Sequence, residues 1–399
     1  ATVTITSPVS SFHAEPVGPD AVLVRANNEL SRLRLRSQTK EWTITLPENE
    51  WWDVIGVRDD EVHLRSRTIL RRLDAQTGVV ISETTLPRRA GVLWGETVVS
   101  FQSAAATTAA GDEESEPEIT AGDPEMFSAQ RLLALAKGEA PAPTATEYTV
   151  RFDGATTAET KLAFTKFPRA FVKGDRLVVI GGRNLALFDR IGAPRWQTQL
   201  NAEIVTVTRG AAKLAVATEQ AVSLFDENTG ELRWTQPNFA AKQLKIGPDG
   251  SVYAQIHLTA DQAKEREKEY RPAKVALGGM TIPFAKVPVL LKLEARDGSI
   301  RWGVRNIGEH VLFAGEKLFV ADATENLNLL APSGLFQGYY SVRQLNPRTG
   351  ADLWCYVARG ALVDAQLIGE TPLIIAMTDP PTGRHKPVGT YLLQLIEAK

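Results

Sequence analysis

The sequence predicts an all-β fold in which four-stranded antiparallel units repeat eight times within a single domain, residues 1–399. Two repeat series and one pair of incomplete chain ends predict it. The first series is a strand–turn–strand motif with a Gly in the turn and a Trp in the strand that follows. The second is a hairpin that precedes each copy. The chain is 43% hydrophobic and 23% charged, which is typical of a globular protein and excludes a disordered or disulfide-scaffold chain.

The strand–turn–strand motif is clearest in four segments. Each has an apolar residue, a polar turn that contains Gly, and a Trp, at residues 225–234, 293–302, 345–354 and, one residue shorter, 188–196. Weaker copies begin at Leu33, Leu73 and Phe152, and an eighth begins at Leu395, where the sequence stops. Each copy predicts a strand, a tight turn and a second strand.

Each copy is preceded by two short alternating apolar runs that flank a turn. The turn residues are Gly18-Pro19-Asp20, Asp59-Asp60, Gly95-Glu96, Gly174-Asp175, Gly210, Asp249-Gly250, Gly315-Glu316 and Gly369-Glu370. Turn residues between runs of period two predict hairpins. A hairpin followed by a strand–turn–strand copy makes four antiparallel strands, the composition of a propeller blade. We therefore predict an eight-bladed β-propeller.

The two chain ends are predicted to complete one another. The last copy lacks its fourth strand, whereas Thr2-Val3-Thr4-Ile5-Thr6 is an alternating β-branched segment without a blade of its own. We expect this N-terminal strand to become the outer strand of the eighth blade. That arrangement closes the ring and covers an otherwise open strand edge.

The copies at 225–234 and 345–354 follow the pattern apolar-Asp/Asn-x-x-Thr-Gly-x-x-x-Trp. This pattern resembles the repeat of pyrroloquinoline-quinone-type eight-bladed propellers, a family that includes quinoprotein alcohol dehydrogenases and the BamB-type factors of outer-membrane β-barrel assembly. The resemblance covers nearly the whole chain. It implies that the motif tryptophans are wedges between blades, and these are Trp42, Trp196, Trp234, Trp302 and Trp354.

The sequence predicts no catalytic residue, no cofactor and no metal site. Quinoprotein dehydrogenases of the family have an adjacent Cys-Cys pair, which the lone Cys355 cannot form. The five histidines, His13, His63, His257, His310 and His385, show no metal-ligand spacing. Asp226-x-Asn228-x-Gly230 is too short for a calcium loop, so we expect Asp226 to cap its own turn. The chain is therefore not expected to be an enzyme.

Four insertions are expected between the second and third strands of their blades, at residues 103–146, 257–288, 324–338 and 378–388. Equivalent loops of a propeller emerge on one face, which is where function tends to lie. Helices are predicted over 124–137 and 259–269. The first insertion carries seven acids and no base between Ser103 and Glu125; it is either a solvated flexible loop or a strap held by a partner subunit.

The loop from Leu327 to Tyr340 is the most apolar insertion. If its side chains are exposed together they form an interface, and the alternative is that they fold over the ring and become buried. We predict partner binding by the five residues Leu329, Leu330, Leu335, Phe336 and Tyr339.

Composition restricts the partners and the location. With 45 basic and 47 acidic residues the net charge is −2, which argues against nucleic acid as a partner. No apolar run is long enough to predict a transmembrane segment. Ala at residue 1 fits a mature exported protein and also a trimmed chain. We expect a periplasmic or outer-membrane-associated protein.

The expected function is that of a non-catalytic bacterial envelope scaffold. The family resemblance implies that its protein partner is the β-barrel assembly machinery. BamB-type factors carry a lipid anchor on an N-terminal Cys, whereas residue 1 is Ala. A second interpretation is therefore an accessory subunit of another envelope or membrane complex. A third is a quinoprotein-type propeller enzyme.

Overall fold

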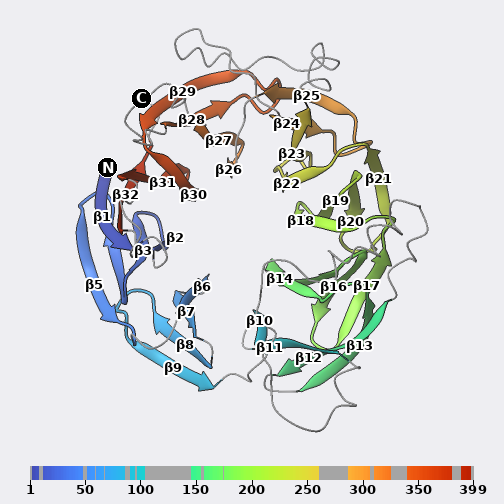
Figure 1. The fold of residues 1–399 in the computed structure, drawn as a ribbon, viewed down its shortest axis with the longest axis horizontal. Coiled ribbons are helices and arrows are strands. Elements are labelled where there is room, and N and C mark those ends of the chain that lie inside the picture. Colours follow the sequence, from blue (N-terminus) through green and yellow to red (C-terminus); the bar gives the residue numbers. More distant parts are fainter. Residues whose placement is uncertain are drawn as a thin grey trace, which may run out of the picture. The chain divides into compact units, whose positions relative to one another are not determined.

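The computed structural model describes residues 2–8, 12–47, 52–58, 60–66, 68–85, 90–94, 97–103, 145–153, 157–173, 175–259, 286–305, 310–324, 339–379 and 388–396. These residues form eight four-stranded antiparallel sheets, drawn in Figure 1. The fold class is the predicted eight-bladed β-propeller, and we number the sheets as blades 1–8 in chain order. The chain divides into two compact units, unit 1 (Ala1–Arg88 with Val205–Lys399) and unit 2 (Arg89–Ile204). Its treatment as one domain stays a prediction.

Unit 1 contains blades 1, 2 and 5–8. Blade 1 is β2 (His13–Pro16), β3 (Ala21–Ala26), β4 (Glu29–Arg34) and β5 (Thr39–Thr45). Blade 2 is β6 (Asp53–Arg58), β7 (Glu61–Arg65), β8 (Ile69–Asp74) and β9 (Val80–Thr85). Blade 5 is β18 (Ile204–Gly210), β19 (Lys213–Thr218), β20 (Ala221–Asp226) and β21 (Leu232–Pro237).

Blade 6 is β22 (Ala241–Ile246), β23 (Val252–Thr259), β24 (Lys286–Leu293) and β25 (Ile300–Arg305). Blade 7 is β26 (His310–Ala314), β27 (Lys317–Thr324), β28 (Tyr339–Leu345) and β29 (Asp352–Arg359). Blade 8 is β30 (Ala361–Ile368), β31 (Thr371–Asp379), β32 (Val388–Leu395) and β1 (Thr2–Pro8).

Unit 2 contains blades 3 and 4. Blade 3 is β10 (Ala90–Trp94), β11 (Thr97–Ser103), β12 (Thr146–Asp153) and β13 (Ala158–Phe164). Blade 4 is β14 (Arg169–Lys173), β15 (Arg176–Gly181), β16 (Asn184–Arg190) and β17 (Ala193–Gln199). In chain order, seven of the eight predicted hairpin turns fall between the first and second strands of their blades, and Gly210 is the last residue of β18, directly before the turn at Ala211-Ala212.

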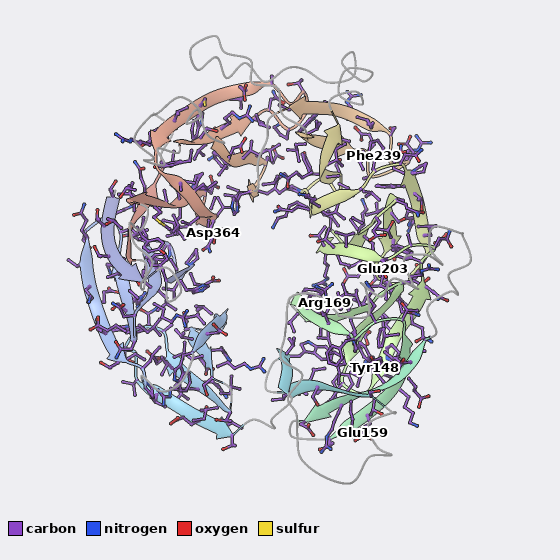
Figure 2. All side chains as sticks on the ribbon, in the orientation of Figure 1. Tyr148, Glu159, Arg169, Glu203, Phe239 and Asp364 are labelled. Atoms are coloured by element: carbon purple, nitrogen blue, oxygen red, sulfur yellow. The ribbon has the colours of Figure 1, made fainter. Side chains whose placement is uncertain are left out.

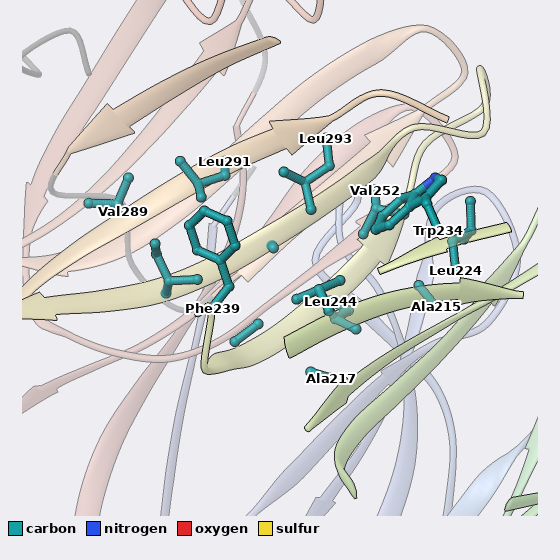
Figure 3. Close-up of a cluster of buried hydrophobic side chains, with 14 residues drawn as sticks. Ala215, Ala217, Leu224, Trp234, Phe239, Leu244, Val252, Val289, Leu291 and Leu293 are labelled. Carbon is teal, nitrogen blue, oxygen red and sulfur yellow. The ribbon is translucent and has the colours of Figure 1, made fainter. Parts of the chain in front are cut away.

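Residue type follows the position of a strand in its blade. Second strands such as β3 are buried along almost their whole length, because one face packs against blade 8 and the other against blade 2. Fourth strands such as β17 alternate between exposed and half-buried residues, because only one of their faces is covered. Each buried hydrophobic cluster of unit 1 joins two consecutive blades, and Figure 3 shows the one between blades 5 and 6.

The strand–turn–strand motif owes its Trp position to a repeated bulge. In blade 5 the register between β20 and β21 shifts between Leu224 and Phe225, which places Trp234 opposite Leu224. The same shift occurs at the end of the third strand in blades 1, 2, 4, 6 and 7. Blade 3 pairs Phe152 with Ala158 without a shift, and it has no motif Trp.

The N-terminal strand completes blade 8, as predicted. β1 pairs antiparallel with β32 from Thr2 opposite Gln394 to Pro8 opposite Val388. Val3 and Ile5 of β1 pack against the buried cluster that joins blades 8 and 1. Figure 1 shows β1 beside β32 in this blade.

The predicted insertions fall between the second and third strands of blades 3, 6, 7 and 8, although strands extend into two of them: β23 reaches Thr259 and β24 begins at Lys286, and β31 reaches Asp379. The strand pairs that flank them are β11 and β12, β23 and β24, β27 and β28, and β31 and β32. The bodies of the insertions, with the predicted helices and the acidic stretch, lie outside the described residues. Among the residues that are described, none belongs to a helix able to span a membrane.

Candidate functional site

The predicted partner-binding residues belong to blade 7. Leu329, Leu330, Leu335 and Phe336 lie outside the described residues. Tyr339 is the first residue of β28, and its backbone pairs with Thr324 on one side and Arg359 on the other. Partner binding by these five residues stays a prediction.

Three motif tryptophans contact the blade that follows their own. Trp42 Nε1 donates a hydrogen bond to the Ala75 carbonyl (3.2 Å), Trp234 Nε1 to the Ala295 carbonyl (3.3 Å) and Trp302 Nε1 to the Pro347 carbonyl (3.1 Å). Each acceptor lies in the turn between the third and fourth strands of the next blade. Figure 3 shows Trp234 at the end of the buried cluster between blades 5 and 6.

The turn glycine of the next blade makes room for each indole ring. A Cβ added at Gly78, Gly298 or Gly350 would lie within 2.8 Å of the ring of Trp42, Trp234 or Trp302, respectively. All three glycines also have φ between +70° and +73°. The Gly of the motif is therefore needed for both its backbone conformation and its lack of a side chain.

A substitution at this glycine is expected to cost more than one at an unconstrained turn glycine. Gly298→Ala combines left-handed backbone strain of about 1 kcal/mol with overpacking against Trp234 of about 1–3 kcal/mol. The matched control is Gly315→Ala, where φ is +57° and no atom lies within 4 Å of an added Cβ. Urea unfolding of both variants measures the difference. Equal losses would show that the contact with Trp234 is not tight.

Trp354 and Trp196 are placed differently from the other three. Trp354 Nε1 donates to Gln344 Oε1 (2.6 Å) of its own blade. Blade 8 has no turn between its third and fourth strands, because β1 supplies the fourth strand, so no turn carbonyl is available to Trp354. Trp196 lies half-buried on β17 of unit 2. The hydrogen bonds to the next blade support an inter-blade role for Trp42, Trp234 and Trp302. For Trp196 and Trp354 this role stays a prediction.

Asp226 caps its own turn. Its Oδ1 accepts hydrogen bonds from the backbone N–H groups of Asn228 (3.0 Å) and Thr229 (3.1 Å), and Arg233 binds its other oxygen at 2.6 Å. The hydrogen bond from Arg233 is the main reason that the pKa of Asp226 lies below its usual range. A carboxylate engaged in this way serves the turn and not a bound cation.

Polar side chains on the first strands of blades 7, 8 and 1 form a connected cluster. His310 Nδ1 on β26 lies 3.4 Å from Asp364 Oδ1 on β30. Gln366 Nε2, also on β30, donates to Asp364 Oδ2 (2.6 Å) and to the Ala14 carbonyl of β2 (3.1 Å). On β2, His13 Nε2 lies 3.8 Å from Glu15 Oε2. We call these five residues, His13, Glu15, His310, Asp364 and Gln366, the inner cluster; Figure 2 labels Asp364.

Arg25 and Asp53 extend the inner cluster to blade 2. Arg25, which is only 6% exposed, donates from Nη1 to the carbonyl of Trp52, the residue before β6. Arg25 and Asp53 both act electrostatically on His13. The inner cluster and its extension thus link blades 7, 8, 1 and 2.

Burial shifts two groups of the inner cluster toward their neutral forms. Burial, followed by the positive charge of Arg25, lowers the pKa of His13 and outweighs the carboxylates of Asp364 and Asp53. Burial and the nearby Asp364 raise the pKa of Glu15. Both shifts have the physical cause expected for partly desolvated titratable groups.

The two shifts predict opposite effects of pH on stability. Between pH 6.5 and the lowered pKa of His13 the unfolded chain binds a proton that the folded chain does not, so His13 makes the fold less stable as pH falls. Between the raised pKa of Glu15 and pH 4.5 the folded chain binds the extra proton, so Glu15 has the reverse effect.

Two amide variants separate these contributions. His13→Gln is expected to lessen the loss of stability below pH 6.5, by at most about 1.4 kcal/mol per pH unit. Glu15→Gln is expected to steepen the loss at lower pH. Urea unfolding free energies measured from pH 4 to pH 8 test both signs, and parallel pH profiles for wild type and variants would contradict them.

The groups of the inner cluster are engaged by one another and by the backbone of their own strands. In the part of the chain that the structure describes, no three His, Cys, Asp or Glu side chains converge to hold a metal. The carboxylate of Asp364 is engaged by β30 itself, through Gln366 and the Ala365 N–H (2.8 Å). The sequence offers no local signal for the cluster, because His310 and His13 are brought near Asp364 only when blades 7, 8 and 1 assemble.

Solved structures with a similar fold and one family model match this chain. Among solved structures, BamB from Moraxella catarrhalis aligns with a TM-score of 0.53 and 14% identity, covering 98% of this chain and 97% of that one. The computationally designed Ika8 protein aligns at 0.55 and 8% identity, with 96% of each chain covered. The C-terminal WD40 domain of Sif2 aligns at 0.52 and 10% identity, over 98% of this chain and 97% of that one. At these identities the likeness shows the fold alone.

The sequence matches no curated protein. A family model described as "Outer membrane protein assembly factor BamB" matches residues 148–266 and 219–383, which together make up more than half of the chain. This match includes the strict motif copies at 225–234 and 345–354 on which the resemblance was based. The chain therefore belongs to the BamB-like family of propeller proteins with pyrroloquinoline-quinone-type repeats.

Proposed function

We propose that this protein is a non-catalytic interaction scaffold of the bacterial cell envelope, located in the periplasm or at the outer membrane. The observation that carries the proposal is the family match over residues 148–383, whose description names an outer membrane protein assembly factor. The partner is then a protein, or several proteins, of the machinery that assembles outer-membrane proteins.

The distribution of insertions supports a binding role. Blades 6, 7 and 8 are consecutive, and each carries its insertion between the second and third strands. The strands that bear these loops are well packed, since Val289, Leu290 and Leu291 of β24 are fully buried. Long loops on a rigid framework are a common design for partner recognition.

Affinity capture tests the proposal. The full chain is immobilised and incubated with detergent-solubilised envelope from its native host, and the eluate is analysed by mass spectrometry and by absorbance. We expect a stoichiometric outer-membrane assembly protein and a colourless eluate.

Other outcomes would replace the proposal. A stoichiometric partner from another envelope complex would favour an accessory subunit of that complex. A quinone-like absorbance without a protein partner would favour a quinoprotein-type enzyme. Either result contradicts a role in outer-membrane protein assembly.

A further inference from the structure

The fourth strand of blade 7, β29, differs from the other Trp-bearing fourth strands on its uncovered face. Along β29, Trp354, Tyr356 and Ala358 are half-buried and pack in the cluster between blades 7 and 8. The alternate residues Leu353, Cys355 and Val357 are exposed, Leu353 to 56% and Val357 to 39%. We call these three residues the β29 row.

The equivalent positions of the other blades provide a comparison within the same chain. The residues on either side of the motif Trp are Glu41 and Thr43 in β5, Arg195 and Gln197 in β17, Arg233 and Thr235 in β21, and Arg301 and Gly303 in β25. Each of those pairs contains a charged residue, and only Gly303 lacks a polar side chain. In β29 the equivalents are Leu353 and Cys355, and Val357 follows. The repeat motif therefore does not require apolar residues at these positions, and the β29 row is a particular feature of blade 7.

The backbone edge beside the β29 row is also unpaired among the described residues. The strand order of blade 7 is β26-β27-β28-β29, so β29 has a neighbour on one side only. Edge strands are usually protected from pairing by charged side chains or Pro. Between Asp352 and Arg359 the strand has neither. A six-residue edge without charge or Pro, bounded by Asp352 and Arg359, is suited to pairing with another strand.

We propose that β29 is the docking edge for a second copy of this chain, in an antiparallel strand pair centred on Cys355. A second copy is the expected partner because the β29 row has an apolar residue at equal distance on either side of Cys355, so two copies of the row match each other when they run antiparallel. Antiparallel pairing about that residue places each Leu353 opposite Val357 of the second copy. The apolar rows of the two copies then lie side by side on one face of the joined sheet, where opposed side chains contact each other. Each Arg359 approaches the end of the second copy's strand that carries Asp352, so the charges at the two ends are also complementary.

The interface is small, so the association is expected to depend on concentration. One strand edge and three apolar side chains per copy fall at the low end of the sizes of specific interfaces, for which dissociation constants are roughly micromolar. Sedimentation velocity of the full chain from about 1 to 100 μM should then show a shift from the mass of one chain to that of two.

A matched pair of variants tests the surface. Val357→Glu places a carboxylate in the row and is expected to leave the protein monomeric over the same concentrations. Leu232→Glu is the control, because Leu232 is a similarly exposed residue (51%) on β21, the fourth strand of blade 5; this variant should still dimerise. Both sites are exposed, and near-UV circular dichroism checks that both variants are folded.

A charge exchange tests the register. Leu353→Lys alone should abolish the dimer, and the double variant with Leu353→Lys and Val357→Glu should restore it. In the proposed register each new ammonium group faces a new carboxylate of the other copy. Restoration in the double variant is not expected from a merely structural disturbance.

Cys355 provides a direct probe of the centre of the pair, since it is the chain's one cysteine. Directly opposed residues in an antiparallel pair have Cα atoms about 4.5–5.5 Å apart, within the range for a disulfide. Copper-phenanthroline oxidation should therefore give a covalent dimer with wild type and not with Val357→Glu. The reaction is run in alkaline buffer, because burial raises the pKa of the Cys355 thiol.

Three results would overturn the proposal. They are a monomer at every concentration, a dimer that Val357→Glu leaves intact, and a dimer that cannot be linked through Cys355. The first would leave the β29 row as a surface for a different protein, and the others would place self-association elsewhere.

Discussion

Removal of the N-terminal strand is expected to cost about 3–6 kcal/mol of unfolding free energy. Deleting residues 2–8 removes the outer strand of blade 8 and its pairing with β32 over seven positions. Val3 and Ile5 lose their packing against the cluster between blades 8 and 1, and each buried aliphatic side chain contributes about 1.5–3 kcal/mol when fully covered. The freed edge of β32 adds unpaired backbone groups.

Point variants within β1 provide the control for this deletion. Ile5→Asp is expected to reproduce much of the loss, because Ile5 packs inward opposite Tyr391. Thr4→Asp changes a neighbouring exposed position and should stay within about 0.5 kcal/mol of wild type. Urea unfolding measures all three variants. If the deletion unfolds at the same urea concentration as wild type, β1 does not complete blade 8 in solution.

Replacement of Trp234 by Ala is expected to cost about 3–5 kcal/mol, the range for buried aromatic side chains. Trp234 is 7% exposed, packs in the cluster between blades 5 and 6, and donates to the Ala295 carbonyl of the next blade. Trp234→Phe keeps one six-membered ring but loses the N–H donor and part of the buried indole volume, so its cost should be smaller, about 1–3 kcal/mol.

Trp354→Ala is the informative comparison for Trp234→Ala. Trp354 is half-buried and its N–H is accepted within its own blade by Gln344, so its loss should be clearly smaller. The measurement is again the unfolding free energy in urea. Equal losses at the two sites would mean that the hydrogen bond to the next blade does not distinguish them.

The parts of the fold that local chemistry determines were predictable from the sequence. Gly315-Glu316 and Gly369-Glu370 mark hairpin turns because Gly adopts the positive φ that such turns require, and their flanking runs alternate with period two. Residues 2–6 were assigned to blade 8 because the last repeat copy lacked a fourth strand and this segment had no blade of its own. These inferences depend on neighbouring residues or on counting strands.

The candidate site was less predictable because it depends on contacts between distant segments. His310 and His13 are brought near Asp364 only after blades 7, 8 and 1 have packed. Trp354 has the same sequence motif as Trp234, yet the absence of a turn in blade 8 changes the acceptor of its N–H. The β29 row could have been found by comparing the residues beside each Trp once the motif had been aligned.

The proposed function is tested most directly by measuring how much envelope protein two immobilised forms of this chain capture. One is the wild-type chain, and the other carries alanine at Leu329, Leu330, Leu335, Phe336 and Tyr339. Both are immobilised at equal density, checked for equal urea stability, and exposed to the same solubilised native envelope. The account predicts that wild type retains a stoichiometric outer-membrane assembly protein and that the alanine variant retains at least tenfold less, the equivalent of about 1.4 kcal/mol. If wild type retains no envelope protein, the scaffold function is contradicted; if both retain the partner equally, this loop is not its binding site.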